Sequence, residues 1–233
     1  MTARANVVLV PGLLCTKALW EPQMAALGDI AEMTVGVHTR HDSIGGIAKS
    51  ILAAAPQQFA LAGLSMGGFV AFEILRQAPQ RVTRLALLDT NARTDLPERS
   101  EQRRQMIAQA EREGLQRVVD GLLQGFLRPA AQADKRLTDT VRRMADNTGI
   151  EGFKRQQSAI IRRLDSRPFL RSIRCPTLVL VGHDDVLTPV AMAQEIAAGI
   201  PGAKLEIVPD CGHLSTLEQP EAVSRALRVW LTQ

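Results

Sequence analysis

Residues 63–67 read Gly-Leu-Ser-Met-Gly, a G-x-S-x-G pattern that stands between an apolar run and an amphipathic segment. In this pattern the serine occupies a sharp turn from a strand into a helix, which exposes its hydroxyl above a sheet. The helix that follows turns its N-terminal N–H groups, and the positive end of its dipole, toward developing negative charge. Glycines would also serve a tight turn without any chemistry. Ser65 is therefore a candidate nucleophile that needs support from elsewhere in the chain.

A serine nucleophile needs a base that takes its proton and an acid that orients the base. The chain has four histidines, and only His213 follows both a plausible acid loop and the last strand-like segment. The acid loop, Val-Gly-His-Asp-Asp, offers Asp184 and Asp185 together, and spacing alone does not choose between them. Asp89, at the end of an earlier apolar run, is a rival. Serine, acid and histidine in this chain order accompany the G-x-S-x-G turn in hydrolases with such a triad.

Acyl transfer also needs donors for the negative oxygen of the tetrahedral intermediate. The first is the N–H of Met66, directly after the serine, and the second is expected from Leu13 in the loop Val-Pro-Gly-Leu-Leu-Cys. An apolar pocket suited to a short or medium acyl group is expected beside them. The side chains expected to line it are Leu14, Phe126, Phe153 and Leu214. This chemistry requires no metal and no organic cofactor.

The cysteine content and the composition argue against several other classes of protein. Three cysteines, Cys15, Cys175 and Cys211, show no C-x-x-C spacing, which disfavours a disulfide framework or metal site and fits a reducing compartment. None of them lies in a nucleophile turn, so cysteine chemistry is the weaker alternative. The sequence contains no apolar run of about 18 residues, the length that would predict a membrane-spanning helix. We expect a cytoplasmic protein without a membrane partner.

Short apolar runs alternate with helical patterns along most of the chain. Nearly continuous apolar runs are typical of parallel strands buried on both faces, so the alternation predicts an α/β fold with helices on both sides of a sheet. The strands are expected at 6–10, 33–37, 58–62, 84–88, 177–181 and 204–208. The helices between them are expected near 17–27, 43–55, 66–78, 190–199 and 220–232.

Residues 93–171 break the alternation, because they show only helical patterning. Asp95 and Glu98 suggest a capping box, and Gly114 a helix stop. After Gly114, apolar residues recur on one helical face. We therefore predict a core formed by residues 1–92 and 172–233, and a helical insertion at 93–171 that lies on the sheet.

The charge of this segment is distinctive. Residues 93–174 carry 18 Lys and Arg against 11 Asp and Glu, a net charge of +7, whereas the rest of the chain carries 10 against 13. These charges are either the solvated faces of surface helices or a site for an acidic carrier protein or carboxylate-bearing substrate. Nucleic acid is a poor fit, because aromatic residues make up only 3% of the chain and tyrosine is absent.

Taken together, these motifs resemble those of the α/β-hydrolase superfamily from end to end. The matching stretches are "VLVPGLLC", "LAGLSMGG", "VGHDD" and "CGHLSTLEQPE". The chain looks closest to compact bacterial carboxylesterase-like members, including the pimeloyl-carrier-protein methyl ester esterases. The resemblance implies a mostly parallel sheet of about six strands and identifies residues 93–171 as a helical cap, or lid, over the substrate pocket. Its G-x-x-D pattern places the acid at Asp185. One departure is Pro-Gly where the family usually has His-Gly in the oxyanion loop.

The sequence thus favours a serine hydrolase that cleaves a small-molecule carboxylic ester through an acyl-enzyme. Two alternatives remain open. A lyase or C–C hydrolase would use the same triad on a small anionic substrate. A hydrolase-fold binding protein would use the fold without catalysis.

Overall fold

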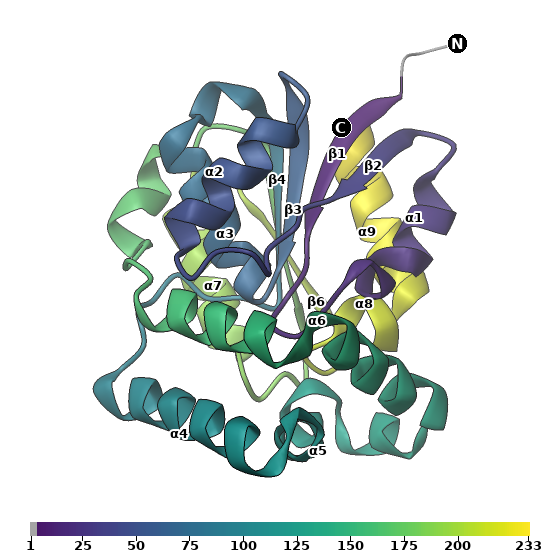
Figure 1. The fold of residues 1–233 in the computed structure, drawn as a ribbon. Helices are drawn as coiled ribbons and strands as arrows, with labels where there is room; N and C mark the ends of the chain where they lie inside the picture. The colour runs from purple at the N-terminus through teal and green to yellow at the C-terminus, as the bar shows by residue number, and fades with distance from the viewer. Residues whose placement is uncertain (1–3) are drawn as a thin grey trace.

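Six parallel strands form one sheet in the order β2-β1-β3-β4-β5-β6 in the computed structural model, which describes residues 4–233 (Figure 1). The strands are β1 (Ala5–Val10), β2 (Ala31–Val35), β3 (Phe59–Leu64), β4 (Val82–Leu88), β5 (Thr177–Gly182) and β6 (Lys204–Val208). Each predicted strand lies within one or two residues of an observed one, and the predicted parallel sheet with helices on both faces is confirmed.

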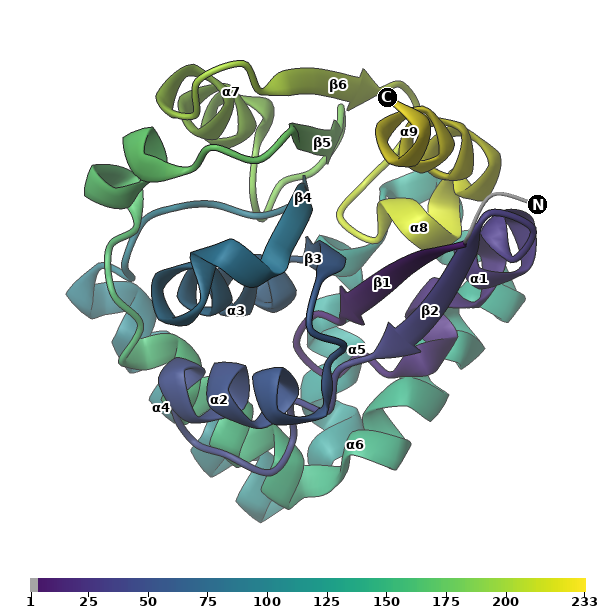
Figure 2. The same cartoon turned by 90° about the horizontal axis from the view of Figure 1, so that it is seen from above.

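Helices cover both faces of the sheet (Figure 2). One face carries the pair α1 (Glu21–Leu27) and α9 (Pro220–Thr232). The helices on the other face are α2 (Ile44–Ala54), α3 (Met66–Gln77) and α7 (Val190–Gly199). Every residue of the interior strands β3 and β5 is buried as a result, which accounts for their uninterrupted apolar sequences.

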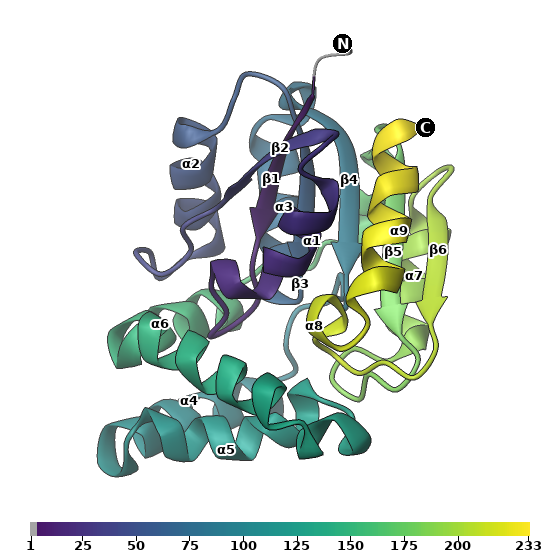
Figure 3. The same ribbon diagram turned by 90° about the vertical axis from the view of Figure 1, so that its right-hand side faces the viewer.

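Three long helices follow β4 and lie across the carboxyl ends of the strands (Figures 1 and 3). They are α4 (Pro97–Glu113), α5 (Leu115–Phe126) and α6 (Lys135–Ile161), and α6 kinks at Gly149, where φ is 68°. Gly114 ends α4 with a φ of 90°. These helices include most of the predicted cap, whose boundaries at 93 and 171 stay a prediction.

The predicted capping box at the start of α4 is wrong. Leu96, not Asp95, is the N-cap residue, and Pro97 occupies the first turn without a side-chain cap. Asp95 instead forms ion pairs with Arg103 and Arg163. A long-range pair with two arginines has replaced the local bond that the Asp-x-x-Glu spacing suggested.

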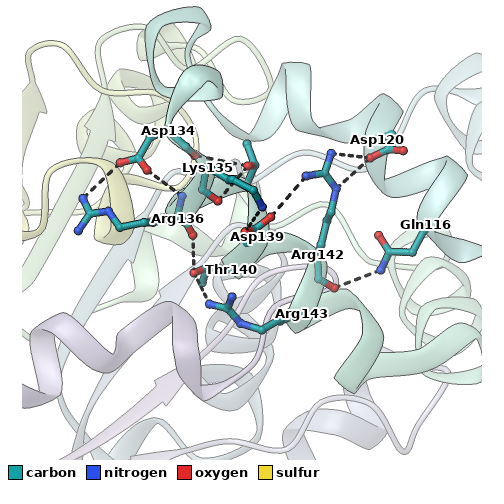
Figure 4. Close-up of polar contacts among 10 residues, drawn as sticks. Gln116, Asp120, Asp134, Lys135, Arg136, Asp139, Thr140, Arg142 and Arg143 are labelled. Carbon is teal, nitrogen blue, oxygen red and sulfur yellow. Dashed lines mark hydrogen bonds and ion pairs between the residues drawn. The ribbon is translucent and has the colours of Figure 1, made fainter.

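Exposed polar contacts join α5 to the first half of α6 (Figure 4). Arg142 of α6 donates from Nε and Nη2 to Oδ1 of Asp120, at 3.1 and 2.9 Å. Its backbone carbonyl accepts a hydrogen bond from the amide of Gln116. Lys135 and Asp139 pair one turn apart on α6 at 2.6 Å. Such exposed pairs each contribute little to stability. They place an aspartate beside both Lys135 and Arg142, so the charge of these two side chains is matched locally.

Two further short helices complete the elements used below: α8 (Ser215–Glu218) and the 3-10 helix η4 (Arg167–Ser172). Between residues 4 and 233, none of the helices has the length and apolar character that crossing a bilayer requires.

Candidate active site

Ser65 lies at the turn from β3 into α3, with φ 55° and ψ −114°. A non-glycine residue in this region carries backbone strain of about 1–3 kcal/mol, which the surroundings must hold in place. Two hydrogen bonds do so: the N–H of Ser65 donates to the carbonyl of Leu88 at 2.9 Å, and Thr90 Oγ1 donates to the carbonyl of Ser65 at 2.7 Å. The neighbouring strand β4 and the residues just after it thus hold the strained serine.

The glycines beside Ser65 allow close backbone approach. A Cβ at Gly67 would overlap the carbonyl oxygen of Val10 on β1, and a Cβ at Gly63 would overlap the backbone of Gly67. The first turn of α3 therefore lies directly against β1 and β3. This packing makes the turn sharp enough to lift the hydroxyl above the ends of the strands.

His213 forms hydrogen bonds through both ring nitrogens. Its Nε2 lies 2.8 Å from Ser65 Oγ and its Nδ1 lies 2.8 Å from Asp185 Oδ2. The imidazole is 2% exposed and stacks at 15° on the ring of Phe126, with ring centroids 6.2 Å apart. The N–H of Leu214 donates to the carbonyl of Phe126, which ties the histidine loop to the end of α5. The structure therefore brings together the three residues proposed from the sequence.

Asp185 is held by a set of donors from the residues that follow it. Oδ1 accepts the N–H groups of Leu187 and Thr188 at 2.8 and 2.9 Å, and Oδ2 accepts the Thr188 hydroxyl at 2.6 Å. The pKa of Asp185 lies below its ordinary value: burial opposes this, but the charge of His213 and these hydrogen bonds outweigh it. Thr188 was absent from the predicted site residues.

The pKa of His213 lies above its ordinary value. Burial alone would lower it, but the negative charge and hydrogen bond of Asp185 have the larger combined effect. The pair therefore favours an imidazolium whose N–H groups face the Asp185 carboxylate and Ser65. A histidine with this property can accept a proton from the serine hydroxyl.

The other two carboxylates that the sequence left open lie elsewhere. Asp184 points to the ring of the exposed His183, at 2.9 Å. Asp89 is fully buried; it accepts the N–H of Gly182 and the hydroxyl of Ser215. Burial, followed by the charge of Asp185, raises the pKa of Asp89 to about 8. Neither Asp184 nor Asp89 hydrogen-bonds the imidazole of His213.

The loop after β1 places backbone N–H groups near the serine. Leu13 and Met66 line the same cavity as Ser65, and within residues 4–233 neither of their N–H groups donates to a protein acceptor. Leu14 adopts a φ of 60°, and its N–H donates to Gln156 Oε1 of α6 at 3.0 Å. On the other side, His38 Nε2 donates to the carbonyl of Gly12 at 2.9 Å. Two long-range bonds thus fix this loop, and sequence patterns gave no signal for either.

The cavity above Ser65 has a volume of about 470 Å³. Its wall includes Ser65, His213 and Phe126, together with residues of α4, α6 and the loop before α7. Leu14, Phe153 and Leu214, which were also expected beside the pocket, are not part of this cavity wall. Their side chains are at most 1% exposed and pack into the core.

The cysteines are poor nucleophiles in this environment. Cys15 and Cys211 are buried, and burial raises the pKa of both thiols, that of Cys15 to about 12. Their thiolate forms are therefore suppressed. Among residues 4–233, no group of three or more His, Cys, Asp or Glu is arranged to hold a metal ion.

Several known proteins are similar to this chain. BpoC of Mycobacterium tuberculosis, named as a candidate non-heme bromoperoxidase, is 32% identical over 176 residues. That match covers 71% of this chain and 64% of BpoC, so the chain spans less than two thirds of that relative's length. The pimeloyl-[acyl-carrier protein] methyl ester esterase of Aromatoleum aromaticum is 27% identical over 204 residues, covering 80% of this chain and 79% of that protein.

A thermophilic esterase from Thermogutta terrifontis has a similar structure, with a TM-score of 0.89 and 30% identity over 97% of this chain and 89% of its own. The sequence pattern of the alpha/beta hydrolase family matches residues 7–226, which is nearly the whole chain. The fold, the order of the motifs and this match agree: the chain belongs to the α/β-hydrolase family.

Proposed function

We propose that the protein is a serine hydrolase that cleaves a small-molecule carboxylic ester with a small to medium acyl chain. The observation that carries the proposal is the continuous hydrogen-bonded series from Ser65 through His213 to Asp185, with 2.8 Å at each link. Similar proteins named as esterases, from Thermogutta terrifontis and Aromatoleum aromaticum, support the same class of reaction.

In the proposed reaction, Ser65 Oγ attacks the ester carbonyl while its proton passes to His213 Nε2. Asp185 keeps the other proton of the ring on Nδ1 and stabilises the imidazolium that forms. The N–H groups of Leu13 and Met66 donate to the oxyanion of the tetrahedral intermediate. His213 then returns the proton to the leaving alcohol, which gives an acyl-enzyme and free alcohol.

Hydrolysis of the acyl-enzyme repeats these steps with water in place of serine. His213 Nε2 takes a proton from the attacking water, and the same two N–H groups stabilise the second oxyanion. Collapse releases the carboxylic acid, and the proton on His213 returns to Ser65 Oγ. Each proton therefore has a donor and an acceptor within the triad, and the proposed steps call on no other group.

The test combines a covalent probe with a series of esters. A fluorophosphonate probe is expected to label the wild-type protein and the Ser172→Ala variant, since Ser172 is exposed on η4 and outside the cavity wall. It is expected not to label Ser65→Ala. Turnover of 4-nitrophenyl esters of increasing chain length should fall by about 10³-fold or more in Ser65→Ala.

Failure of the wild-type protein to react with the probe would remove Ser65 as a nucleophile and favour the binding-protein alternative. Reaction with the probe but turnover of none of the esters would favour a lyase or C–C hydrolase that uses the same three residues.

A further inference from the structure

We infer that the cavity selects esters whose acyl part carries a free carboxylate, and that Arg103 and Arg99 of α4 bind that carboxylate. This inference rests on the proposed function, because it names the substrate class of the same site.

The stripe of α4 that faces the cavity is unusual for a helix packed over an active site. Leu96, Arg99, Arg103 and Met106 all line the cavity, at the three- and four-residue spacing of one helical face. Packing alone would favour apolar side chains at all these positions. Two arginines in the middle of the stripe therefore favour a ligand with an acidic group inside the cavity.

Arg103 has a free donor although its side chain is only 12% exposed. Its Nε donates to Asp95 Oδ2 at 2.5 Å, and its Nη1 donates to Gln157 Oε1 at 2.9 Å. Its Nη2 meets no acceptor among residues 4–233. The amide nitrogen of the buried Gln157 likewise has no partner there. Nη2 of Arg103 thus lacks an acceptor, which a ligand carboxylate would supply.

The positive charge around Arg103 is also not fully matched by negative charge. Asp95 is shared with Arg163, whose Nη2 lies 2.7 Å from Asp95 Oδ1, and both of these side chains are 5% exposed. One carboxylate therefore faces two guanidinium groups in a poorly solvated place. Burial of an unmatched charge is costly, and an anionic ligand beside Arg103 would match it. Arg163 already uses two of its other nitrogens, because Nε donates to the carbonyl of Arg93 and Nη1 to that of Ile160.

The remaining arginines of the wall divide into paired and unpaired ones. Arg93 pairs with Glu195, and Arg167 pairs with Asp165. Arg99 donates only to the amide oxygen of Gln102. The five arginines of the wall thus face three carboxylates, which leaves a net excess of two positive charges.

Ion pairs match part of the positive charge on the outer surface of the cap. At the start of α6, Lys135, Arg136 and Arg142 each face an aspartate (Figure 4). Arg99 and the shared Asp95 leave unmatched positive charge on the cavity wall itself, which a carboxylate on a small substrate would match. We therefore assign the acidic group to the substrate rather than to a carrier protein.

The cavity provides both ends of such a substrate with a partner. Ser65, Leu13 and Met66 line the same cavity as the arginines, and Phe126 and Met106 supply apolar surface. A guanidinium group binds carboxylates through paired N–H donors. Monoesters of short dicarboxylic acids have this arrangement, with an ester at one end of a methylene chain and a carboxylate at the other.

The experiment compares two esters of matched length, mono-4-nitrophenyl glutarate and 4-nitrophenyl pentanoate, in which a methyl group replaces the carboxylate. The wild-type protein is expected to have the higher kcat/KM for the glutarate ester. Arg103→Gln should lower the ratio of the two kcat/KM values by about 10- to 100-fold, the range for one hydrogen bond to a charged group. Arg99→Gln should lower the ratio without disturbing the Asp95 pairs.

The matched control is Arg104→Gln, on the same helix. Arg104 is 57% exposed, pairs with Glu101 and lies outside the cavity wall, so both rates should stay as in the wild-type protein. Equal losses for both esters in the Arg103 and Arg99 variants would overturn the inference and make these arginines structural. A wild-type preference for the neutral ester would also overturn it, while leaving the proposed hydrolase function in place.

Binding of glutarate separates the inference from the proposed function. Calorimetry with Ser65→Ala should detect glutarate binding that is lost in Ser65→Ala combined with Arg103→Gln. This result would support the carboxylate site even if the wild-type protein hydrolysed neither ester. No binding by Ser65→Ala would overturn it, as would an effect of Arg103→Gln only on esters attached to an acyl-carrier protein.

Discussion

Asp89 and Asp185 follow the neighbouring strands β4 and β5 and lie close enough for the charge of Asp185 to raise the pKa of Asp89, yet only Asp185 contacts His213. Asp185 is surrounded by donors from Leu187 and Thr188, which stabilise its charged form. Asp89 is enclosed more completely, and its neutral form is favoured. Two aspartates at the same edge of the sheet thus have opposite preferences, and each preference has a measurable consequence.

Asp185→Asn is expected to change both the rate and the pH profile of ester hydrolysis. His213 must be neutral to act as a base, and its raised pKa places the acidic limb of kcat/KM above pH 6.5, the ordinary value. Without the charge of Asp185, burial dominates and lowers the pKa, so the limb moves to lower pH. The rate should fall by about 10⁴-fold, as for loss of the acid in similar triads.

The control for this prediction is Asp184→Asn, because within residues 4–233 the carboxylate of Asp184 hydrogen-bonds only His183, at the surface. It should leave the rate and the limb unchanged. An acidic limb in Asp185→Asn at the wild-type position would contradict the prediction.

Asp89→Asn should make the protein relatively more stable at alkaline pH. In the folded protein the pKa of Asp89 is raised to about 8 from its ordinary value of 3.8, so between these values the folded state holds a proton that the unfolded state releases. The wild-type protein therefore loses this contribution to the free energy of unfolding as pH rises through that range. Asparagine is neutral at all these pH values and can still accept from Gly182 and bond Ser215.

The measurement is Tm at pH 5 and pH 8 for both proteins. The Tm of the variant minus that of the wild-type protein should be larger at pH 8 than at pH 5. The increase should be about 2–4 °C for each kcal/mol that protonation of Asp89 contributes to the free energy of unfolding. A shift of one pKa unit corresponds to about 1.4 kcal/mol. An identical change of Tm with pH in the two proteins would rule out a protonated Asp89.

Gly67→Ala and Gly121→Ala should have opposite effects on stability. The new Cβ at Gly67 would overlap the carbonyl oxygen of Val10, and only a backbone shift relieves this; we expect a loss of about 1–3 kcal/mol and loss of activity. Gly121 lies on the exposed side of α5, and a Cβ added there would have no neighbouring atom within 4 Å. Alanine at this position should stabilise the helix by about 0.5–1 kcal/mol.

Thermal unfolding of both variants, with ester hydrolysis as a second measurement, checks this pair of predictions. A Gly67→Ala protein with wild-type Tm and activity would show that the turn tolerates a wider spacing between α3 and β1 than the structure indicates.

Features encoded within short stretches were predictable from the sequence. Buried parallel strands such as β3 and β5 consist of continuous apolar residues, and the glycines around Ser65 mark the turn because no larger residue fits. The order of Ser65, Asp185 and His213 reflects the order of the strands, since each residue follows a strand of the same sheet. Local patterns therefore predicted the sheet and the positions that meet at its edge.

Features that depend on packing between distant segments were not predictable. Gln156 contacts the loop at Leu14 from 142 residues away, and no local pattern records that contact. Asp95 had the spacing of a helix cap, but its carboxylate forms ion pairs with Arg103 and Arg163 instead. Leu214 directly follows His213 and Phe153 is an apolar residue of the helical segment, yet both side chains pack into the core.

The contact between Gln156 and Leu14 also affects how this protein can change during evolution. On α6, Gln156 holds the loop that carries the Leu13 N–H, and Ile160, one turn later, lines the cavity. Any shift of α6 that reshapes the cavity therefore also moves the N–H group that we propose as an oxyanion donor. The side chains of α4 line the cavity, but in the described chain they form no hydrogen bond to the triad or to that loop. New substrate preferences are consequently accessible through α4 at little cost to the chemistry, whereas α6 is constrained by the reaction itself.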